Sequence, residues 1–137
     1  MTASIQTLTL EDARRLIAGG EAQATKMGIP YNIAVVDAGG NLIAHVRMDG
    51  AWLGSIDISI HKAFTARAFD MSTEALSKAS QSGDSLFGIH ATNLGKIVIF
   101  GGGVPIKVGD QVIGALGASG GSVAQDIEVA EAAAKAF

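Results

Sequence analysis

Residues 101–121, GGGVPIKVGDQVIGALGASGG, hold two glycine clusters on either side of a short apolar segment. The residues between the clusters, Ile106–Ile113, predict two strands joined by a Gly-Asp turn. Because glycine has no Cβ, each cluster allows the backbone to approach another backbone or a ligand closely. The stretch therefore predicts either tight strand–helix packing or main-chain amides that face an anion.

The second cluster leads into Ser122–Gln125, a capping-box pattern that predicts the start of a final helix ending at Phe137. Free N–H groups at a helix N-terminus favour negative charge. Neither cluster is a dinucleotide fingerprint, because a βαβ unit does not follow. Asp126 falls in the first turn of this helix, where it would at least stabilise the helix dipole.

Working outward, hydrophobic periodicity and turn residues predict elements on both sides of a central sheet. The predicted elements are helix 10–27, strands 33–36 and 42–48 around a turn at 37–41, helix 55–69, a short helix from Ser72 or Thr73, strand 96–100, the glycine-flanked hairpin and the last helix. Hairpin connections dominate, so the sheet should be mainly antiparallel. The predicted class is α+β, an α-β-α sandwich of the profilin or PAS type with about five strands.

Composition limits the possible functions. The 137 residues predict one domain, 1–137, and the absence of cysteine excludes thiol catalysis and disulfides. A net charge of −3 without a basic block argues against nucleic-acid binding, and no signal peptide or membrane-spanning run is visible. We expect a cytoplasmic protein. Mean hydropathy is +0.35 with only 17% charged residues, which favours a homo-oligomer.

Several charged side chains are candidates for binding. His45 and Arg47, and Asp49 if the strand extends to it, alternate with apolar residues and share one side of the sheet, which is either a solvated face or a pocket wall. Lys62 lies in an apolar helix, where it either extends to water or binds a carboxylate or a cofactor propionate. Ser119 would need a histidine from elsewhere in the fold to act as a nucleophile.

The three histidines, His45, His61 and His90, show no metal-binding spacing, so no zinc site is expected. Haem iron needs only one axial donor, and any of the three histidines qualifies. Sequence spacing does not choose among them.

The ordered segments 33–44, 47–51, 62–63, 102–105 and 114–126 resemble the GlcG/HbpS-like family, also found as the C-terminal domain of PduO-type cobalamin adenosyltransferases. The resemblance covers nearly the whole chain. It implies a profilin-like α-β-α sandwich with a five-stranded antiparallel sheet and dimer-based oligomers such as tetramers or octamers. It also implies non-covalent binding of haem b, with haem degradation ascribed to some members.

Carried over by position, the family motif residues imply one pocket, in the chain or at a subunit interface, that accepts a small anionic ligand or haem. These residues are Asp37, Arg47, Asp49, Lys62, Gly102, Gly103, Pro105, Ser119, Gly120 and Asp126. The chain departs from the family pattern at two positions, where it has His45 and His61.

Three functions remain open from the sequence. The first is a haem-binding, haem-degrading domain. The second is an enzyme for a carboxylated or carbonyl substrate, with Arg47 and Lys62 binding the anion and His45 or His61 as catalytic proton-transfer groups. The third is a non-catalytic oligomeric scaffold. The sequence does not decide between catalysis and binding.

Overall fold

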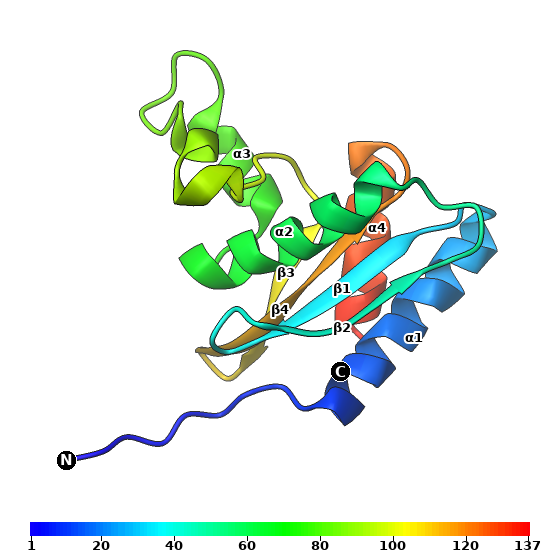
Figure 1. Cartoon of the computed structure of the whole chain (residues 1–137), viewed down its shortest axis with the longest axis horizontal. Coiled ribbons are helices and arrows are strands. Elements are labelled where there is room, and N and C mark those ends of the chain that lie inside the picture. The colour runs from blue at the N-terminus through cyan, green and yellow to red at the C-terminus, as the bar shows by residue number, and fades with distance from the viewer.

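The computed structural model describes all 137 residues as four helices, four strands and two short 3-10 turns (Figure 1). The strands form one antiparallel sheet in the order β2-β1-β4-β3, which confirms the predicted α+β class. The elements in chain order are α1 (Leu10–Met27), β1 (Asn32–Asp37), β2 (Leu42–Arg47), α2 (Gly54–Phe69), α3 (Thr73–Ser80), η1 (Ile89–Ala91), η2 (Asn93–Gly95), β3 (Gly103–Val108), β4 (Gln111–Ser119) and α4 (Val123–Ala134).

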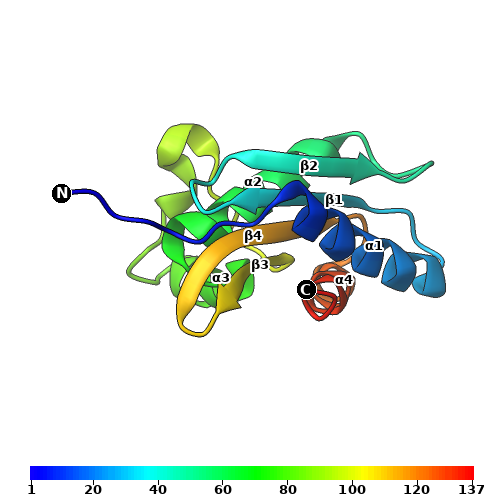
Figure 2. The ribbon, with the colours of Figure 1, turned by 90° about the horizontal axis from the view of Figure 1, so that it is seen from below.

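The helices cover the two faces of the sheet. Successive side chains of β1 point to opposite faces, so Ile33 and Val35 join the larger core with α1 and α4, whereas Ala34 and Val36 pack against α2. Figure 2 shows α1 and α4 side by side along one face. The predicted capping box at Ser122 is present at the start of α4, and a second capping box at Thr9 starts α1. α4 ends at Ala134, three residues before the predicted end.

The first two glycines of the second cluster, Gly114 and Gly117, lie inside a strand rather than in a turn. β4 runs without interruption to Ser119, so only Gly120, Gly121 and the N-cap Ser122 connect it to α4. The backbone of α2 packs directly on this strand, because a Cβ at Gly117 would overlap the carbonyl oxygen of Ser59. Of the two alternatives left open by the sequence, tight strand–helix packing is the one observed at Gly117.

The prediction of a fifth strand at residues 96–100 is wrong. This segment has no regular secondary structure. Ile97 is buried, but the polar backbone groups next to it bond to a side chain of α2. The Thr65 hydroxyl accepts from Val98 N at 3.0 Å. It donates to His61 O of α2 at 2.7 Å, which leaves Lys96 O at 3.3 Å as a weaker second contact. Residues 96–100 therefore bond to Thr65 of α2 instead of pairing with a neighbouring strand. The sheet has four strands.

Residues 81–96, between α3 and the segment just described, form a protrusion that we call the arm. It projects away from the sandwich (Figure 1). At the sheet itself, the edge strand β3 carries Pro105 and Lys107, residues that disfavour pairing with another strand, whereas the other edge, β2, carries neither residue type. No helix has the length and apolar character needed to cross a membrane.

Candidate functional site

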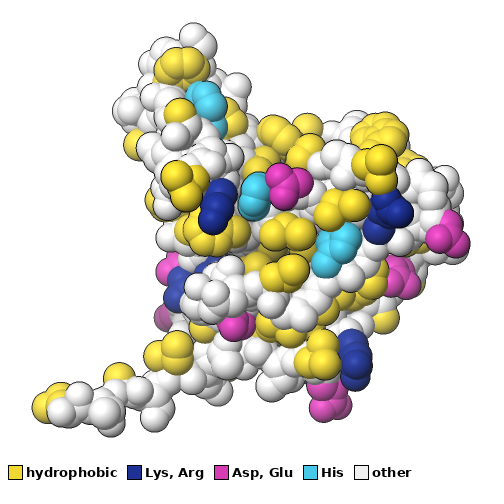
Figure 3. All heavy atoms as spheres, in the orientation of Figure 1, with side chains coloured by type: hydrophobic (Ala, Val, Ile, Leu, Met, Phe, Trp, Pro, Cys, Tyr) yellow, Lys and Arg dark blue, Asp and Glu magenta, His cyan; other side chains and the backbone are white.

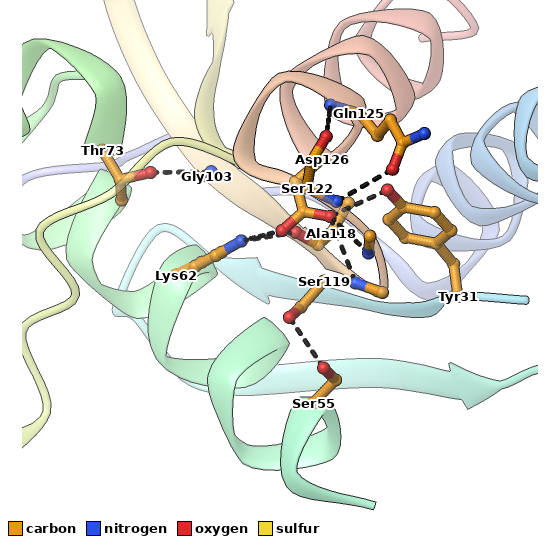
Figure 4. A network of polar contacts seen from close by, with 12 residues as sticks. Tyr31, Ser55, Lys62, Thr73, Gly103, Ala118, Ser119, Ser122, Gln125 and Asp126 are labelled. Atoms are coloured by element: carbon orange, nitrogen blue, oxygen red, sulfur yellow. Dashed lines mark hydrogen bonds and ion pairs between the residues drawn. The ribbon is translucent and has the colours of Figure 1, made fainter. Parts of the chain in front are cut away.

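Two residues singled out from the sequence, Lys62 and Asp126, form a buried ion pair (Figure 4). Lys62 extends from α2, and Asp126 lies in the first turn of α4. The Lys62 Nζ lies 2.6 Å from Asp126 Oδ2 and also donates to the carbonyl oxygen of Ala118 at 2.9 Å. The two side chains are 0% and 5% exposed, so the pair joins helices from opposite faces of the sheet in the absence of water.

The second oxygen of Asp126 is equally engaged. Its Oδ1 accepts from the Tyr31 hydroxyl at 2.8 Å and from the backbone N–H groups of Gly120 and Gly121 at 3.2 and 3.0 Å. Burial, with the neighbouring carboxylate as the next cause, raises the pKa of the Tyr31 phenol, which therefore stays a donor. The carboxylate thus has four donors, and no buried side-chain polar atom of the chain lacks a partner.

The surroundings of the Lys62 ammonium fit it closely. Its Nζ lies 5.0 Å from the centroid of the Phe100 ring, within the range of a cation–π contact. Gly102 makes room for it, because a Cβ there would lie 2.6 Å from Nζ. Burial lowers the pKa of Lys62, and the negative charge of Asp126 opposes that shift. The expectation that Lys62 extends to water is wrong.

This network contains the groups that the sequence predicted for an anionic ligand. The cation of Lys62 and the amide of Gly120 both bind an anion, but within the chain that anion is the carboxylate of Asp126. Gly103 is also engaged internally, since its N–H donates to the Thr73 hydroxyl at 2.9 Å. We conclude that these residues fix α2, α4 and the glycine segments relative to one another.

A second polar group crosses the α2 face of the sheet at the same end. Arg47, Asn32 and Ser119 are opposite one another on β2, β1 and β4, so their side chains point to one face. The Ser119 hydroxyl donates to the Ser55 hydroxyl at 2.9 Å. Asn32 is fully buried, and its Nδ2 donates to the carbonyl oxygen of Trp52 at 2.9 Å. We call Arg47, Asn32, Ser119 and His45 the polar row.

His45 is the titratable member of the polar row. Its Nε2 lies 3.0 Å from Asn32 Oδ1. The Asn32 amide nitrogen donates to Trp52, so Oδ1 is left as an acceptor, and His45 Nε2 must carry the proton. Burial, and then the charge of Arg47, lower the pKa of His45. At neutral pH the ring is therefore uncharged, with a lone pair at Nδ1 that can bind a metal or accept a proton.

The remaining predicted site residues do not join either group. Asp37 lies at the other end of β1, about 17 Å from Asn32 along a strand that rises about 3.3 Å per residue, and its Oδ1 accepts from the N–H groups of Gly39 and Asn41 in the turn. Asp49 is exposed, and Pro105 is half-buried on β3. His61 lies 3.7 Å from Asp57 on α2.

Sequence reasoning missed Tyr31 and Asn32. Both are fully buried and carry polar groups: Tyr31 comes directly before β1, and Asn32 is the first residue of that strand. The signal that could have found them is their position, because a polar pair between Pro30 and a buried strand serves no turn and needs partners once buried. Tyr31 belongs to the Lys62–Asp126 network, and Asn32 orients His45.

The surface hollows lie elsewhere. One, of about 220 Å³, is lined by Phe64, Arg67 and the turn after β1. The other, of about 400 Å³, lies between α1 and α4 and is lined mostly by charged side chains. Drug-sized ligands occupy pockets of roughly 300–1,000 Å³ that are mainly apolar. Neither hollow includes a residue of the polar row.

Comparison with known proteins identifies the family. A model of the haem-degrading HbpS-like protein family matches residues 8–135, and the chain belongs to that family. An uncharacterised 15.0 kDa protein from the dhaT–dhaS intergenic region of Citrobacter freundii is 44% identical, over 97% of this chain and 94% of that protein. The corrinoid adenosyltransferase PduO of the same organism is 36% identical over 96% of this chain, which spans only 39% of PduO. GlcG of Escherichia coli K12 is 37% identical over 82% of this chain and 81% of GlcG.

Solved structures agree with this assignment. ORFY of Klebsiella pneumoniae superposes with a TM-score of 0.97 at 42% identity, covering 99% of this chain and 94% of that one. A crystal structure of a PduOC–haem complex gives a TM-score of 0.92 at 35% identity, covering 97% and 96%. A crystal structure of HbpS gives a TM-score of 0.86 at 29% identity, covering 98% of this chain and 92% of that one. The resemblance to the GlcG/HbpS-like family found in the sequence is confirmed.

Proposed function

We propose that this chain binds haem b non-covalently. The observation that carries the proposal is the close likeness to PduOC, whose crystal structure is that of a haem complex. Membership of a family described as haem-degrading supports it. Binding and degradation are separate claims, and the residues of this chain bear first on binding.

The polar row fits a haem group. A histidine that ligates a metal through one ring nitrogen usually donates the other N–H to a fixed acceptor, which sets its orientation. His45 has this arrangement, with Nε2–H held by Asn32 and Nδ1 unpaired. The exposed cation of Arg47 lies two residues along the same face of β2 and suits a propionate. The exposed side chains of Trp52 and Leu53 provide apolar contact near Asn32.

Bound haem would supply an iron centre for oxygen chemistry or electron transfer. The residues of this chain would hold and orient the group, with His45 as the candidate iron ligand and Arg47 as the partner of a propionate. Degradation of the bound haem is the finer part of the proposal. Its readout is loss of the Soret band with release of iron when a reductant is added in air.

A haemin titration tests the proposal. The wild-type protein should show a saturable one-to-one change in the Soret band. His45→Ala should weaken binding by about tenfold or more and shift the band, because the axial donor is lost. His61→Ala and His90→Ala are matched controls that should keep the wild-type spectrum. Absence of saturable binding by the wild type would overturn haem binding, whereas a normal spectrum for His45→Ala would overturn only the donor.

One observation favours a second candidate, an enzyme for a small carboxylated or carbonyl substrate. The neutral His45 ring lies beside the exposed cation of Arg47, so a base and an anion-binding group share one face. Lys62 does not contribute to this arrangement, since its ammonium is enclosed with Asp126. Catalysis with a small carbonyl compound that His45→Gln abolishes, in protein free of haem, would support this candidate.

We also infer that the protein is a cytoplasmic homo-oligomer. The low content of charged residues supports the homo-oligomer, as do the exposed apolar side chains that gather over α2 and on the arm (Figure 3). Light scattering at micromolar concentration tests the oligomer directly. A monomer there would contradict it.

A further inference from the structure

The arm, residues 81–96, has large apolar side chains with no partner in its own chain. The side chain of Leu94 is 92% exposed, that of Phe87 61% and that of Leu86 42%. Figure 3 shows apolar groups on this protrusion, beyond a notch that separates it from the body of the molecule. Single exposed leucines are common on protein surfaces, but three large apolar residues gathered on one protrusion indicate a contact surface.

The arm is ordered by local hydrogen bonds. The backbone bonds at Phe87, Ile89 and Thr92 each reach back three residues, and the Thr92 hydroxyl donates to Ile89 O at 2.6 Å. The Phe87 ring contacts His90 edge-to-face with ring centroids 5.8 Å apart. Leu86 N donates to Ala79 O of α3, which ties the base of the arm to the body. The arm therefore presents its apolar side chains on a defined backbone.

The tip of the arm has an unfavourable backbone conformation. Asn93 and Leu94 have φ angles of 51° and 58°. Asparagine tolerates this left-handed region, but leucine pays a steric penalty because its Cβ approaches the next carbonyl group. Such a conformation persists where surrounding structure holds it. The backbone bonds from Gly95 N to Thr92 O and from Lys96 N to Asn93 O hold this turn. The turn places the Leu94 side chain on the surface, where it is 92% exposed and has almost no contact within the chain.

We propose that the arm packs against a second copy of this chain, each copy presenting its arm to the other about a two-fold axis. The charge pattern favours an identical partner. Within the arm only Asp84 and Lys96 carry a formal charge, and the two charges have opposite signs. An isologous contact places the same surface on both partners, so a nearly neutral surface avoids the like-charge repulsion that a charged one would suffer.

The apolar side chains make up part of the area that such a contact needs. Leu86, Phe87 and Leu94 together expose roughly 350 Å², compared with about 800 Å² buried per partner in a standard interface. The proposed contact therefore also includes polar and backbone surface of the arm around them. Large apolar side chains near the middle of such a contact carry most of its binding energy.

This inference rests on the oligomer proposed above and names its surface. The test is sedimentation velocity over a concentration series for the wild type, Leu94→Gly and Phe87→Ser. Val108→Ser is the matched control. Val108 is an apolar residue that is 43% exposed, about as much as Leu86, but it lies at the β3–β4 turn and not on the arm. Both arm variants should raise the dissociation constant by about tenfold or more, while the control keeps the wild-type value.

Leu94→Gly gives a second readout. Glycine adopts a positive φ without strain, so thermal unfolding at a concentration where the protein is monomeric should show no loss of stability. A purely structural arm would not combine unchanged or higher monomer stability with weaker assembly. Wild-type assembly by both arm variants would overturn the arm contact and leave the oligomer standing. A wild-type monomer at every concentration would overturn both, and a parallel haemin titration reports separately on haem.

Discussion

The Lys62–Asp126 network and the polar row lie at the same end of the sheet, yet one is closed and the other is open. In the network every charged group has its partners inside the chain, and Lys62 is 0% exposed. In the polar row Arg47 is exposed, and His45 retains one unpaired ring nitrogen. Charged residues and backbone amides that could bind a ligand can instead stabilise the fold, as in the Lys62–Asp126 network. The neighbouring polar row has fewer internal contacts and remains available to a ligand.

The position of α2 explains the difference. This helix lies against β4, where Gly117 admits its backbone, and it contacts β2 much less. The Lys62 side chain therefore extends past Gly102 to Asp126. The side chains of β2 lie at the edge of the part of the sheet that α2 covers. The three predictions that follow test the closed group, the close packing that closes it, and the open group.

The largest effect is expected for Asp126→Ala. It would leave the ammonium of Lys62 buried without its counter-ion and remove the acceptor for Tyr31 and two amides. Breaking a buried pair in this way costs about 3–5 kcal/mol. Urea denaturation should show this loss in the free energy of unfolding.

Glu128→Ala is the matched control for Asp126→Ala. Glu128 is on the same helix but exposed, and it only accepts a bond from Gln23, so the change should stay within about 0.5 kcal/mol. The double variant Lys62→Met with Asp126→Leu should recover only part of the stability, because it removes both buried charges but leaves the Tyr31 hydroxyl and the amides of Gly120 and Gly121 without their acceptor. A loss below about 1 kcal/mol for Asp126→Ala would show that the network is not closed as described.

A smaller effect is expected for Gly117→Ala. The new Cβ would overlap Ser59 O and approach Ala63 N at 2.7 Å, so α2 must move away from β4. Overpacking of this kind costs about 1–3 kcal/mol, which thermal unfolding should detect. Gly54→Ala is the control, because nothing lies within 4 Å of a Cβ there and alanine favours a helix. Equal stability of the two variants would contradict the close contact.

The smallest effect concerns pH and His45. Its pKa in the folded state lies below the ordinary value of 6.5, so near and below that pH the unfolded chain binds more protons than the folded one. Stability is therefore fully present above pH 6.5 and falls as the pH drops from there towards the folded-state pKa. Between about pH 8 and pH 5 the wild type should lose more stability than His45→Gln. Parallel curves for the two proteins would contradict the assigned environment of His45.

Much of the fold is predictable from the sequence because local signals agree with the tertiary structure. The capping boxes at Thr9 and Ser122 mark helix starts that the structure retains. Residues 96–100 mislead because their apolar side chains fit a strand as well as they fit a buried segment. What decides the outcome is Thr65, more than thirty residues away, whose hydroxyl takes the place of a neighbouring strand.

The candidate site is less predictable. The family resemblance groups Lys62 and Asp126 with eight other residues in one ligand pocket, but it does not show that these two neutralise each other. That result depends on how closely α2 approaches β4, which is a property of packing. The role of Asn32 is similarly hidden, because an asparagine acquires its orientation only when Trp52 O and His45 lie on either side of it.

The concealment of Lys62 has a chemical consequence. Every other lysine of this chain is exposed, so its amine is open to acylating reagents at any time. The amine of Lys62 becomes a nucleophile only when α2 and α4 separate and the proton held by Asp126 is released. The rate of covalent labelling at Lys62 would therefore report how often α2 and α4 separate, so this one amine is a built-in probe of the opening of the fold.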